Sequence, residues 1–392
     1  MIDELVDALQ IDRLPTRDRL IENIREMSKG AVDLLPILHS FKNTQHMRVG
    51  IRDILGRDDV VDTHRTLSEV AEACLYTAAK YQTEVMFEKY ARSEKLEKLK
   101  WLEFPLVILG LGKLGGQEPN YHSDLDIVFV YNSEPELVKQ FESCLEDGIS
   151  CQFFFSELAA AITRFVGHSD RHGRLYEVDG RLRPTGKSGS LAVSFDEFER
   201  YFESGKGQLW ERQALCKARP VFGSDANRAS MMNLVYKAIT VLPWDDEWRA
   251  GIRSMRMAMQ KDCSDRNLKR GAGGTVDVEF ITQMLQLQHA QKDQSVLVQG
   301  TRDAIARFKS LGILDAATAD RLTEGYQTLR SVEARLRLMN TTARHDLPDD
   351  PRHLAKLAYL LDYEDATLMS DEVTRHRKTI REVFDTIMPA TQ

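Results

Sequence analysis

The spacing of apolar residues divides the chain into helical stretches at both ends and a strand-rich stretch between them. In the first part, a broken helical stripe runs through Val70, Leu75, Ala78, Ala79, Val85 and Phe87. Ser68 precedes this stripe and is followed by acidic residues, which is typical of an N-cap and predicts that a helix begins there. The charged residues 94–98 indicate a solvated helix end. We therefore expect an N-terminal helical segment over residues 1–100.

Shorter apolar runs, typical of strands, take over between residues 101 and 225. Strands are predicted at 104–109, 125–131, 174–179 and 190–193, with a helix over about 150–166. From 226 to 392 helical spacing returns, as in Val278, Ile281 and Leu285 and again in Leu329, Val332, Leu336 and Met339. The pattern predicts an α+β protein in which a small mixed-sheet core is flanked by the N-terminal helical segment and a C-terminal helical bundle.

Composition narrows the class of protein. The chain has 392 residues, of which 42% are hydrophobic and 29% charged, as in a soluble globular protein with more than one core. A net charge of −7 argues against a general nucleic-acid binder, and no apolar run approaches the ~20 residues of a membrane span. The five cysteines lack a Cys-x-x-Cys spacing, so we expect free thiols in a reducing cytoplasm.

The residues with the clearest chemistry are Asp124 and Asp126, which open the strand predicted at 125–131. Alternate side chains of a strand point to the same face, so the two carboxylates lie together. Such a pair usually needs a cation between its members, and Mg²⁺ prefers carboxylate oxygens and bridges to nucleotide phosphates. The pair therefore predicts phosphoryl- or nucleotidyl-transfer chemistry.

Two glycine-rich segments resemble nucleotide-binding motifs but do not satisfy them. Residues 110–115 match G-x-G-x-x-G, yet the next strand begins too soon for a full βαβ crossover. Residues 180–188 resemble a Walker A loop, but they have five residues between the glycines and include a proline. Neither a Rossmann fold nor a P-loop is expected.

A metal-dependent phosphate site fits these residues better than either nucleotide-binding motif does. The backbone of Gly115 and Gly116 can approach a triphosphate closely, and a third acid, Asp179, ends the strand predicted at 174–179. In a two-metal arrangement Asp124 and Asp126 would bridge the ions and Asp179 would complete the site.

Five basic residues are candidates for neutralising phosphate charge. Lys113, Arg181 and Arg183 are the stronger candidates, although the two arginines could instead pair with the same carboxylates. Lys217 and Arg219 form a weaker basic pair for which either a functional or a structural role is open.

Several motifs now carry a family resemblance. Residues 112–116, 123–126 and 178–184 resemble those of glutamine synthetase adenylyltransferase, a family of the polymerase-β-like nucleotidyltransferase superfamily. The likeness extends to residues 48–55, 210–215, 273–281, 336–340 and 347–348. Members carry two such nucleotidyltransferase domains, one attaching AMP to a tyrosine of glutamine synthetase and one removing it. This chain has a single Asp-x-Asp and a single Arg-Leu-Arg-Pro, so it resembles one half, more closely the C-terminal, adenylylating half.

The resemblance implies roles for individual residues. Asp124, Asp126 and Asp179 would be the metal-binding acids, with ATP as substrate and Gly115, Gly116 and Ser123 lining its phosphates. Asp277 and Glu279 either face the cleft or are ordinary acids of a helix start. Gly180, where other members often have a larger residue, departs from the pattern and leaves the contacts around Asp179 open.

Three alternatives remain at this stage. The same acids could catalyse the reverse reaction, phosphorolysis of AMP-tyrosine, or serve a superfamily member that uses UTP or a tRNA end. The acidic net charge weighs against the tRNA. The third alternative is a catalytically silent nucleotide-binding module, although the intact set of acids argues against it. Glutamine synthetase is the expected partner, and a PII signalling protein is a further one by resemblance.

Overall fold

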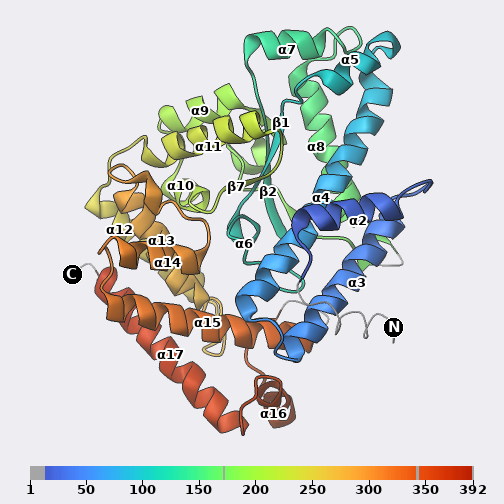
Figure 1. Cartoon of the computed structure of the whole chain (residues 1–392). Coiled ribbons are helices and arrows are strands. Elements are labelled where there is room, and N and C mark those ends of the chain that lie inside the picture. The colour runs from blue at the N-terminus through green and yellow to red at the C-terminus, as the bar shows by residue number, and fades with distance from the viewer. Residues whose placement is uncertain (1–13, 171–172, 341–343, 391–392) are drawn as a thin grey trace.

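The computed structural model describes residues 14–170, 173–340 and 344–390. In Figure 1 the first helices lie on one side of a central sheet and the last helices lie below and beyond its other side. The N-terminal elements are α2 (Arg17–Met27), α3 (Leu35–Ile54), α4 (Val60–Tyr90), η1 (Ser93–Lys95) and α5 (Leu96–Trp101).

The sheet is small and mixed, as the sequence predicted. Its strands are β1 (Leu106–Gly110), β2 (Leu125–Tyr131), β5 (Val178–Asp179), β6 (Ala192–Ser194) and β7 (Arg219–Phe222), in the order β5-β2-β1-β7 with β6 also paired to β2. A separate hairpin joins β3 (Ser169–Asp170) to β4 (Gly173–Arg174). Strand β2 is antiparallel to β1 but parallel to β5 and β6.

Both faces of the sheet are covered, which explains why β1 and β2 are almost continuously apolar. Leu106 and Ile108 join the core formed with the N-terminal helices. Val107 and Leu109, which alternate with them, join the core formed with the C-terminal helices. The helices between and after the strands are α6 (Gly112–Gly115), α7 (Pro135–Glu142), α8 (Cys151–Gly167), η2 (Gly186–Ser188), α9 (Phe195–Glu203), α10 (Leu209–Leu215) and α11 (Asp225–Thr240).

The last third of the chain is helical, as predicted. It contains α12 (Asp246–Gln260), α13 (Thr275–His289), η3 (Gln294–Val296), α14 (Thr301–Ser310), α15 (Ala316–Leu338), α16 (Pro351–Tyr359) and α17 (Ala366–Ile387). The predicted stripe residues Val278, Ile281, Leu329, Val332 and Leu336 are buried, which confirms them as packing faces. Helix α15 crosses beneath the sheet and packs against α4 as well as α17 (Figure 1).

Two sequence predictions were wrong. The helix around residue 70 begins at Val60 with Asp59 as its N-cap, and Ser68 lies buried in its interior, where its hydroxyl donates to Glu72. The strand predicted at 174–179 is reduced to Val178–Asp179, because Arg174 belongs to the hairpin. Strand β7 was missed, since Pro220 interrupts its short apolar pattern.

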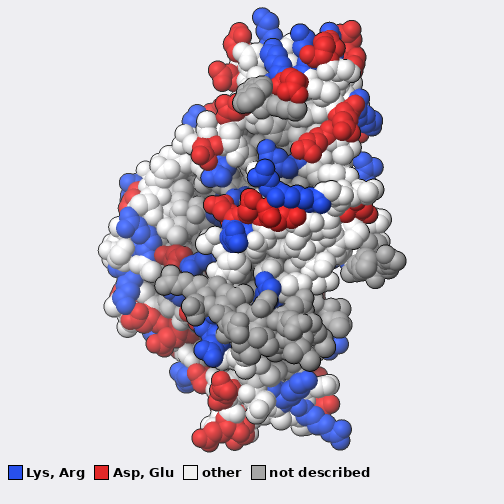
Figure 2. Space-filling model, turned by 45° about the vertical axis from the view of Figure 1, so that its right-hand side comes forward, with Lys and Arg blue, Asp and Glu red and all other residues white. Residues whose placement is uncertain are grey.

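The cysteines, the hydropathy of the helices and the surface charge can also be compared with what the sequence predicted. All five cysteines are free thiols, as predicted. No helix among the described residues is long and apolar enough to cross a membrane. Basic and acidic side chains are mixed over the face shown in Figure 2.

Candidate functional site

Three predicted acids meet at one end of the sheet. Asp126 of β2 lies directly opposite Asp179 of β5 in the parallel register. Asp124 immediately precedes β2 and is exposed. The neighbouring Leu125 and Ile127 point into the core of the N-terminal helices, so Asp126 lies on the opposite face, toward the C-terminal helices. Parallel pairing of β2 with β5 therefore brings together acids that are distant in the sequence.

The local electrostatics reflect this crowding of negative charge. Burial, together with the charges of Asp124 and Asp179, raises the pKa of Asp126 from 3.8 to about 6. Lys269 and Arg181 act in the opposite direction on the same carboxyl group. Lys269, in the loop before α13, is a site residue that sequence reasoning missed, because a single lysine there has no motif around it.

This pKa predicts how stability depends on pH. The folded protein binds an extra proton at Asp126 between pH 3.8 and about 6, so the free energy of unfolding falls as the pH rises through that interval. Asp126→Asn removes the ionised form, and at about pH 7.5 without metal we expect it to stabilise the protein by roughly 1–3 kcal/mol. Urea denaturation at about pH 5 and pH 7.5 measures this.

Asp371→Asn, which changes an exposed aspartate of α17, is the matched control and should leave the free energy of unfolding nearly unchanged. A destabilised Asp126→Asn protein at the higher pH would show that the carboxylate is favourably solvated or paired in the fold.

Asp179 is held by Arg181. The Arg181 Nε donates to both carboxylate oxygens at 2.9 and 2.8 Å, and the Arg181 backbone N–H donates to Oδ1 at 2.9 Å. These bonds, the side-chain ones first, lower the pKa of Asp179. Within the described residues, no three His, Cys, Asp or Glu side chains are grouped closely enough to hold a metal ion. In this structure Arg181 forms an ion pair with Asp179, which was one of the two roles that the sequence left open for it.

Arg183 is bound to the backbone of its own loop. Its guanidinium donates to the carbonyl oxygens of Gly180 at 2.7 Å and Gly189 at 3.2 Å, and the side chain is buried. A Cβ at Gly180 would meet only ordinary contacts, so the missing side chain there creates no special geometry. Arg183 thus orders the loop that follows Asp179.

The glycines of this segment differ in their surroundings. Gly112, at the start of α6 with φ of +50°, lies against Asp126, and a Cβ there would come within 3.0 Å of its carboxylate. Gly115 and Gly116, at the other end of α6, instead pack against the backbone oxygens of Lys217 and Gln299. The glycine that gives room beside the acids is therefore Gly112, which the sequence pattern could not distinguish from its neighbours.

Lys113 is anchored by the C-terminal bundle. Its Nζ lies 3.5 Å from Oε2 of Glu333 on α15. Burial, followed by the charge of Arg330, lowers the pKa of Lys113 to about 7. Glu333 is fully buried and also binds Arg330 at 2.6 Å and His345 at 2.7 Å. Burial alone would raise the pKa of Glu333. The charges of Lys113 and Arg330 outweigh this effect and hold the pKa well below its usual range, so Glu333 stays ionised.

Helix α15 holds both α6 and the segment between α6 and β2 through three residues on one face, Arg330, Glu333 and Arg337. Arg330 donates to the Glu118 carbonyl oxygen, and Glu333 pairs with Lys113. Arg337 donates to the Tyr121 carbonyl oxygen at 2.7 Å and to the Ser123 hydroxyl at 3.3 Å. We call these three residues the α15 clamp. The clamp fixes the segment that leads into Asp124.

The remaining candidates have structural partners. Lys217 is buried and donates to Glu118 at 2.8 Å, while Arg219 binds both carboxylate oxygens of Glu72. Asp277 is fully buried and pairs with Arg256 at 2.5 Å and Arg381 at 3.1 Å, so it ties α13 to α12 and α17.

Glu279 is half-buried, and its charge acts on Lys113, Lys217 and Arg330.

This arrangement, a small mixed sheet with paired aspartates beside a glycine at a helix start, can be compared with known families. The model for glutamate-ammonia ligase adenylyltransferase matches residues 1–233, and the model for GlnD PII-uridylyltransferase matches residues 250–388. The chain belongs to the glutamate-ammonia ligase adenylyltransferase family.

Three similar curated relatives share one name, bifunctional glutamine synthetase adenylyltransferase/adenylyl-removing enzyme. The Thioalkalivibrio sulfidiphilus protein is 30% identical over 376 residues, which cover 95% of this chain and 38% of that protein. The Methylococcus capsulatus protein is 30% identical over 395 residues, 99% of this chain and 40% of that protein. The Nitrosomonas europaea protein is 27% identical over 396 residues, again 99% and 40%. The chain thus spans about two fifths of the length of these relatives.

Proposed function

We propose that this chain transfers AMP from ATP to a tyrosine of glutamine synthetase in the cytoplasm, in a reaction that requires Mg²⁺. The observation that carries the proposal is the register that sets Asp126 beside Asp179, with Asp124 adjoining, in a member of an adenylyltransferase family. The names of the relatives support glutamine synthetase as the acceptor. The match to the PII-uridylyltransferase model over 250–388 supports, more distantly, a PII protein as regulator.

Asp124, Asp126 and Asp179 would hold the metal. Burial and the charges of Asp124 and Asp179 raise the pKa of Asp126 to about 6, and three carboxylates that repel one another form a donor set suited to a hard divalent cation. When bound, Mg²⁺ would supply charge neutralisation at the phosphates and a lower pKa for the acceptor hydroxyl. Arg181, which binds Asp179 in this structure, would bring its guanidinium within reach of phosphates held at the three acids.

The surrounding residues position and neutralise the nucleotide. Gly112 leaves room next to Asp126, while Ser123 is held by Arg337 on the approach to Asp124. Lys269 acts electrostatically on Asp126, and Asp124 acts on Arg337, so both cations add positive charge near the acids. A triphosphate bound to the three acids through Mg²⁺ would therefore meet cations from the C-terminal helices as well as from the sheet.

The direction of the reaction can be tested directly. ATP labelled at the α-phosphate is incubated with the chain, Mg²⁺ and unmodified glutamine synthetase, and in parallel AMP-labelled synthetase is incubated with the chain and phosphate. Label gained by the synthetase in the first reaction supports adenylylation. Label lost only in the second would show the deadenylylating activity instead. No movement of label in either reaction would favour a silent nucleotide-binding module.

Gly112→Ala tests whether space beside Asp126 is required. Because the added Cβ would press on the Asp126 carboxylate, we expect AMP transfer to fall by roughly a hundredfold. Gly56→Ala is the matched control, since Gly56 also has a positive φ, of +62°, but a Cβ there meets nothing within 4 Å. Both variants should lose about 1 kcal/mol of stability from the backbone conformation. Equal activity of the two variants would contradict the assigned role of Gly112.

A further inference from the structure

Lys269 is a cation beside the acids whose ammonium group has no partner among the residues that the structure describes. Both Lys269 and Arg181 act on the Asp126 carboxylate. Arg181 is bound to Asp179, whereas the Lys269 ammonium group forms no hydrogen bond or ion pair with any described residue. A free ammonium group next to carboxylates is able to contact an anion that those carboxylates hold through a metal.

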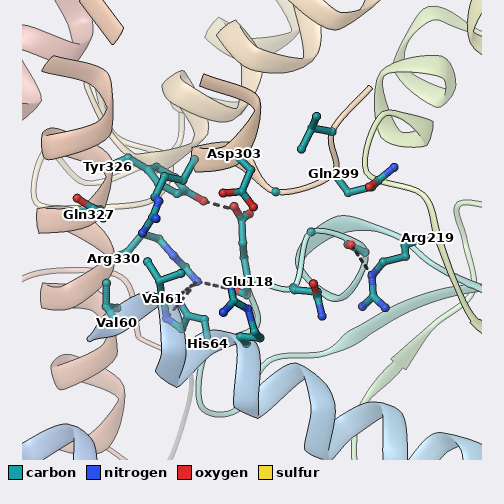
Figure 3. Close-up of a pocket in the computed structure, with 17 residues that line it drawn as sticks. Val60, Val61, His64, Glu118, Arg219, Gln299, Asp303, Tyr326, Gln327 and Arg330 are labelled. Carbon is teal, nitrogen blue, oxygen red and sulfur yellow. Dashed lines mark hydrogen bonds between the residues drawn. The ribbon is translucent and has the colours of Figure 1, made fainter. Parts of the chain in front are cut away.

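Other cations around α6 are already engaged. Figure 3 shows Arg330 directed toward Glu118 and Arg219 directed toward α6, and each of the two arginines donates to a backbone carbonyl oxygen there. Lys113, which the sequence indicated for the phosphates, lies 3.5 Å from the buried Glu333 carboxylate. These three side chains already have acceptors within the protein, and Lys269 does not.

The backbone of Lys269 is fixed on both sides. Its N–H donates to the Asn267 side chain at 3.1 Å, and its carbonyl oxygen accepts from the Val276 N–H at 3.1 Å. The preceding residue, Leu268, is fully buried and donates to the His345 carbonyl oxygen at 2.7 Å. Because the backbone is held in this way, a ligand that binds the lysine would have to order only its side chain.

His345 connects this loop to the α15 clamp and so to α6. Its Nδ1 lies 2.7 Å from Oε1 of Glu333, the same carboxylate that pairs with Lys113. Lys113 belongs to α6, whose first residue lies against Asp126. The charge of Lys269 acts on Asp126, Lys113 and His345 alike. The ammonium group is therefore held on the side of the acids where α6 begins.

We propose that Lys269 contacts the phosphates of the bound nucleotide and neutralises the pyrophosphate that leaves. This role rests on the proposed function. In that reaction a bond forms between the tyrosine oxygen and the α-phosphorus while the bond from the α-phosphorus to the bridging oxygen breaks. The electron pair leaves with pyrophosphate, and the tyrosine proton passes to water. Negative charge grows on the leaving group, where a positioned ammonium group stabilises the transition state.

Calorimetric titration of the whole chain with inorganic pyrophosphate in the presence of Mg²⁺ tests the contact without any AMP transfer. Lys269→Gln should weaken binding of magnesium pyrophosphate about tenfold to a hundredfold and lower kcat for AMP transfer by at least a similar factor. Arg270→Gln is the matched control, because Arg270 is the next residue, is exposed, and has its N–H bound by the same Asn267. It should leave both quantities unchanged.

The outcomes separate this role from the proposed function. Weaker binding in Lys269→Gln than in Arg270→Gln supports the contact. If the wild-type chain showed this binding but transferred no AMP, the proposed function would fail and the phosphate contact would stand. The proposal is overturned if the wild-type chain binds no magnesium pyrophosphate, if both variants bind it equally, or if Lys269→Gln transfers AMP at the wild-type rate.

Urea denaturation distinguishes a phosphate contact from a purely structural lysine. Since the Lys269 ammonium group makes no bond within the described residues, Lys269→Gln should unfold at the same urea concentration as the wild type. Loss of binding accompanied by a clear loss of stability in Lys269→Gln, and not in Arg270→Gln, would assign the lysine to the fold and overturn the proposal.

Discussion

The double substitution Asp124→Asn and Asp126→Asn should reduce AMP transfer at least about a thousandfold while leaving the protein folded. The amide groups keep the shape of the side chains but remove two of the three negative charges that the proposed Mg²⁺ site needs. The fold should persist because both residues lie outside the hydrophobic cores and because burial and like charges disfavour the ionised Asp126 in the metal-free state. Release of pyrophosphate in the presence of glutamine synthetase measures the rate, and circular dichroism measures the fold.

The matched control is again Asp371→Asn on α17, which removes the same charge far from the sheet and should retain full activity. If the double variant still transferred AMP at the wild-type rate, the assignment of these carboxylates to the metal would be wrong. A double variant that failed to fold would instead point to a structural role for the pair.

Glu333→Ala should have the largest effect on stability, a loss of about 3–5 kcal/mol in the free energy of unfolding. The buried carboxylate is the shared partner of Arg330, Lys113, His345 and Arg337, so its removal leaves several buried cations without compensation. Because the same group anchors Lys113 and aligns the α15 clamp, AMP transfer should fall as well. Urea denaturation gives the first quantity, and the transfer assay at saturating ATP gives the second.

Glu324→Ala, an exposed acid on the same helix, should change the free energy of unfolding by no more than about 0.5 kcal/mol. A loss of stability in Glu333→Ala no greater than that of Glu324→Ala would contradict the central place given to Glu333. Full activity in a destabilised Glu333→Ala protein would show that α15 supports the fold without positioning the site.

Some of the site could be predicted because its signals are local. The apolar run of β2 and the alternation of Asp124 and Asp126 depend only on neighbouring residues, and the strand was predicted with the bounds that the structure has. Asp179 was recognised as an acid at a strand end, although that strand proved to be two residues long and depends on parallel pairing with β2.

The parts that could not be predicted depend on distant segments. Nothing around Arg330, Glu333 or Arg337 in the sequence indicates buried cations and a buried anion, because charged residues at helical spacing usually lie on a solvated face. Their burial results from the packing of α15 beneath the sheet, against a turn more than two hundred positions away in the chain. Likewise, only the three-dimensional structure shows that Gly112 rather than Gly116 faces Asp126.

The most direct test of the account is to find the modified residue itself. Unmodified glutamine synthetase is incubated with the wild-type chain, ATP and Mg²⁺, and its peptides are mapped by tandem mass spectrometry. The account predicts AMP on a tyrosine with the wild-type chain, and none with the Asp124→Asn, Asp126→Asn variant or with a chelator in place of Mg²⁺. Synthetase without AMP after incubation with the folded wild-type chain, or AMP present with the variant, would contradict it.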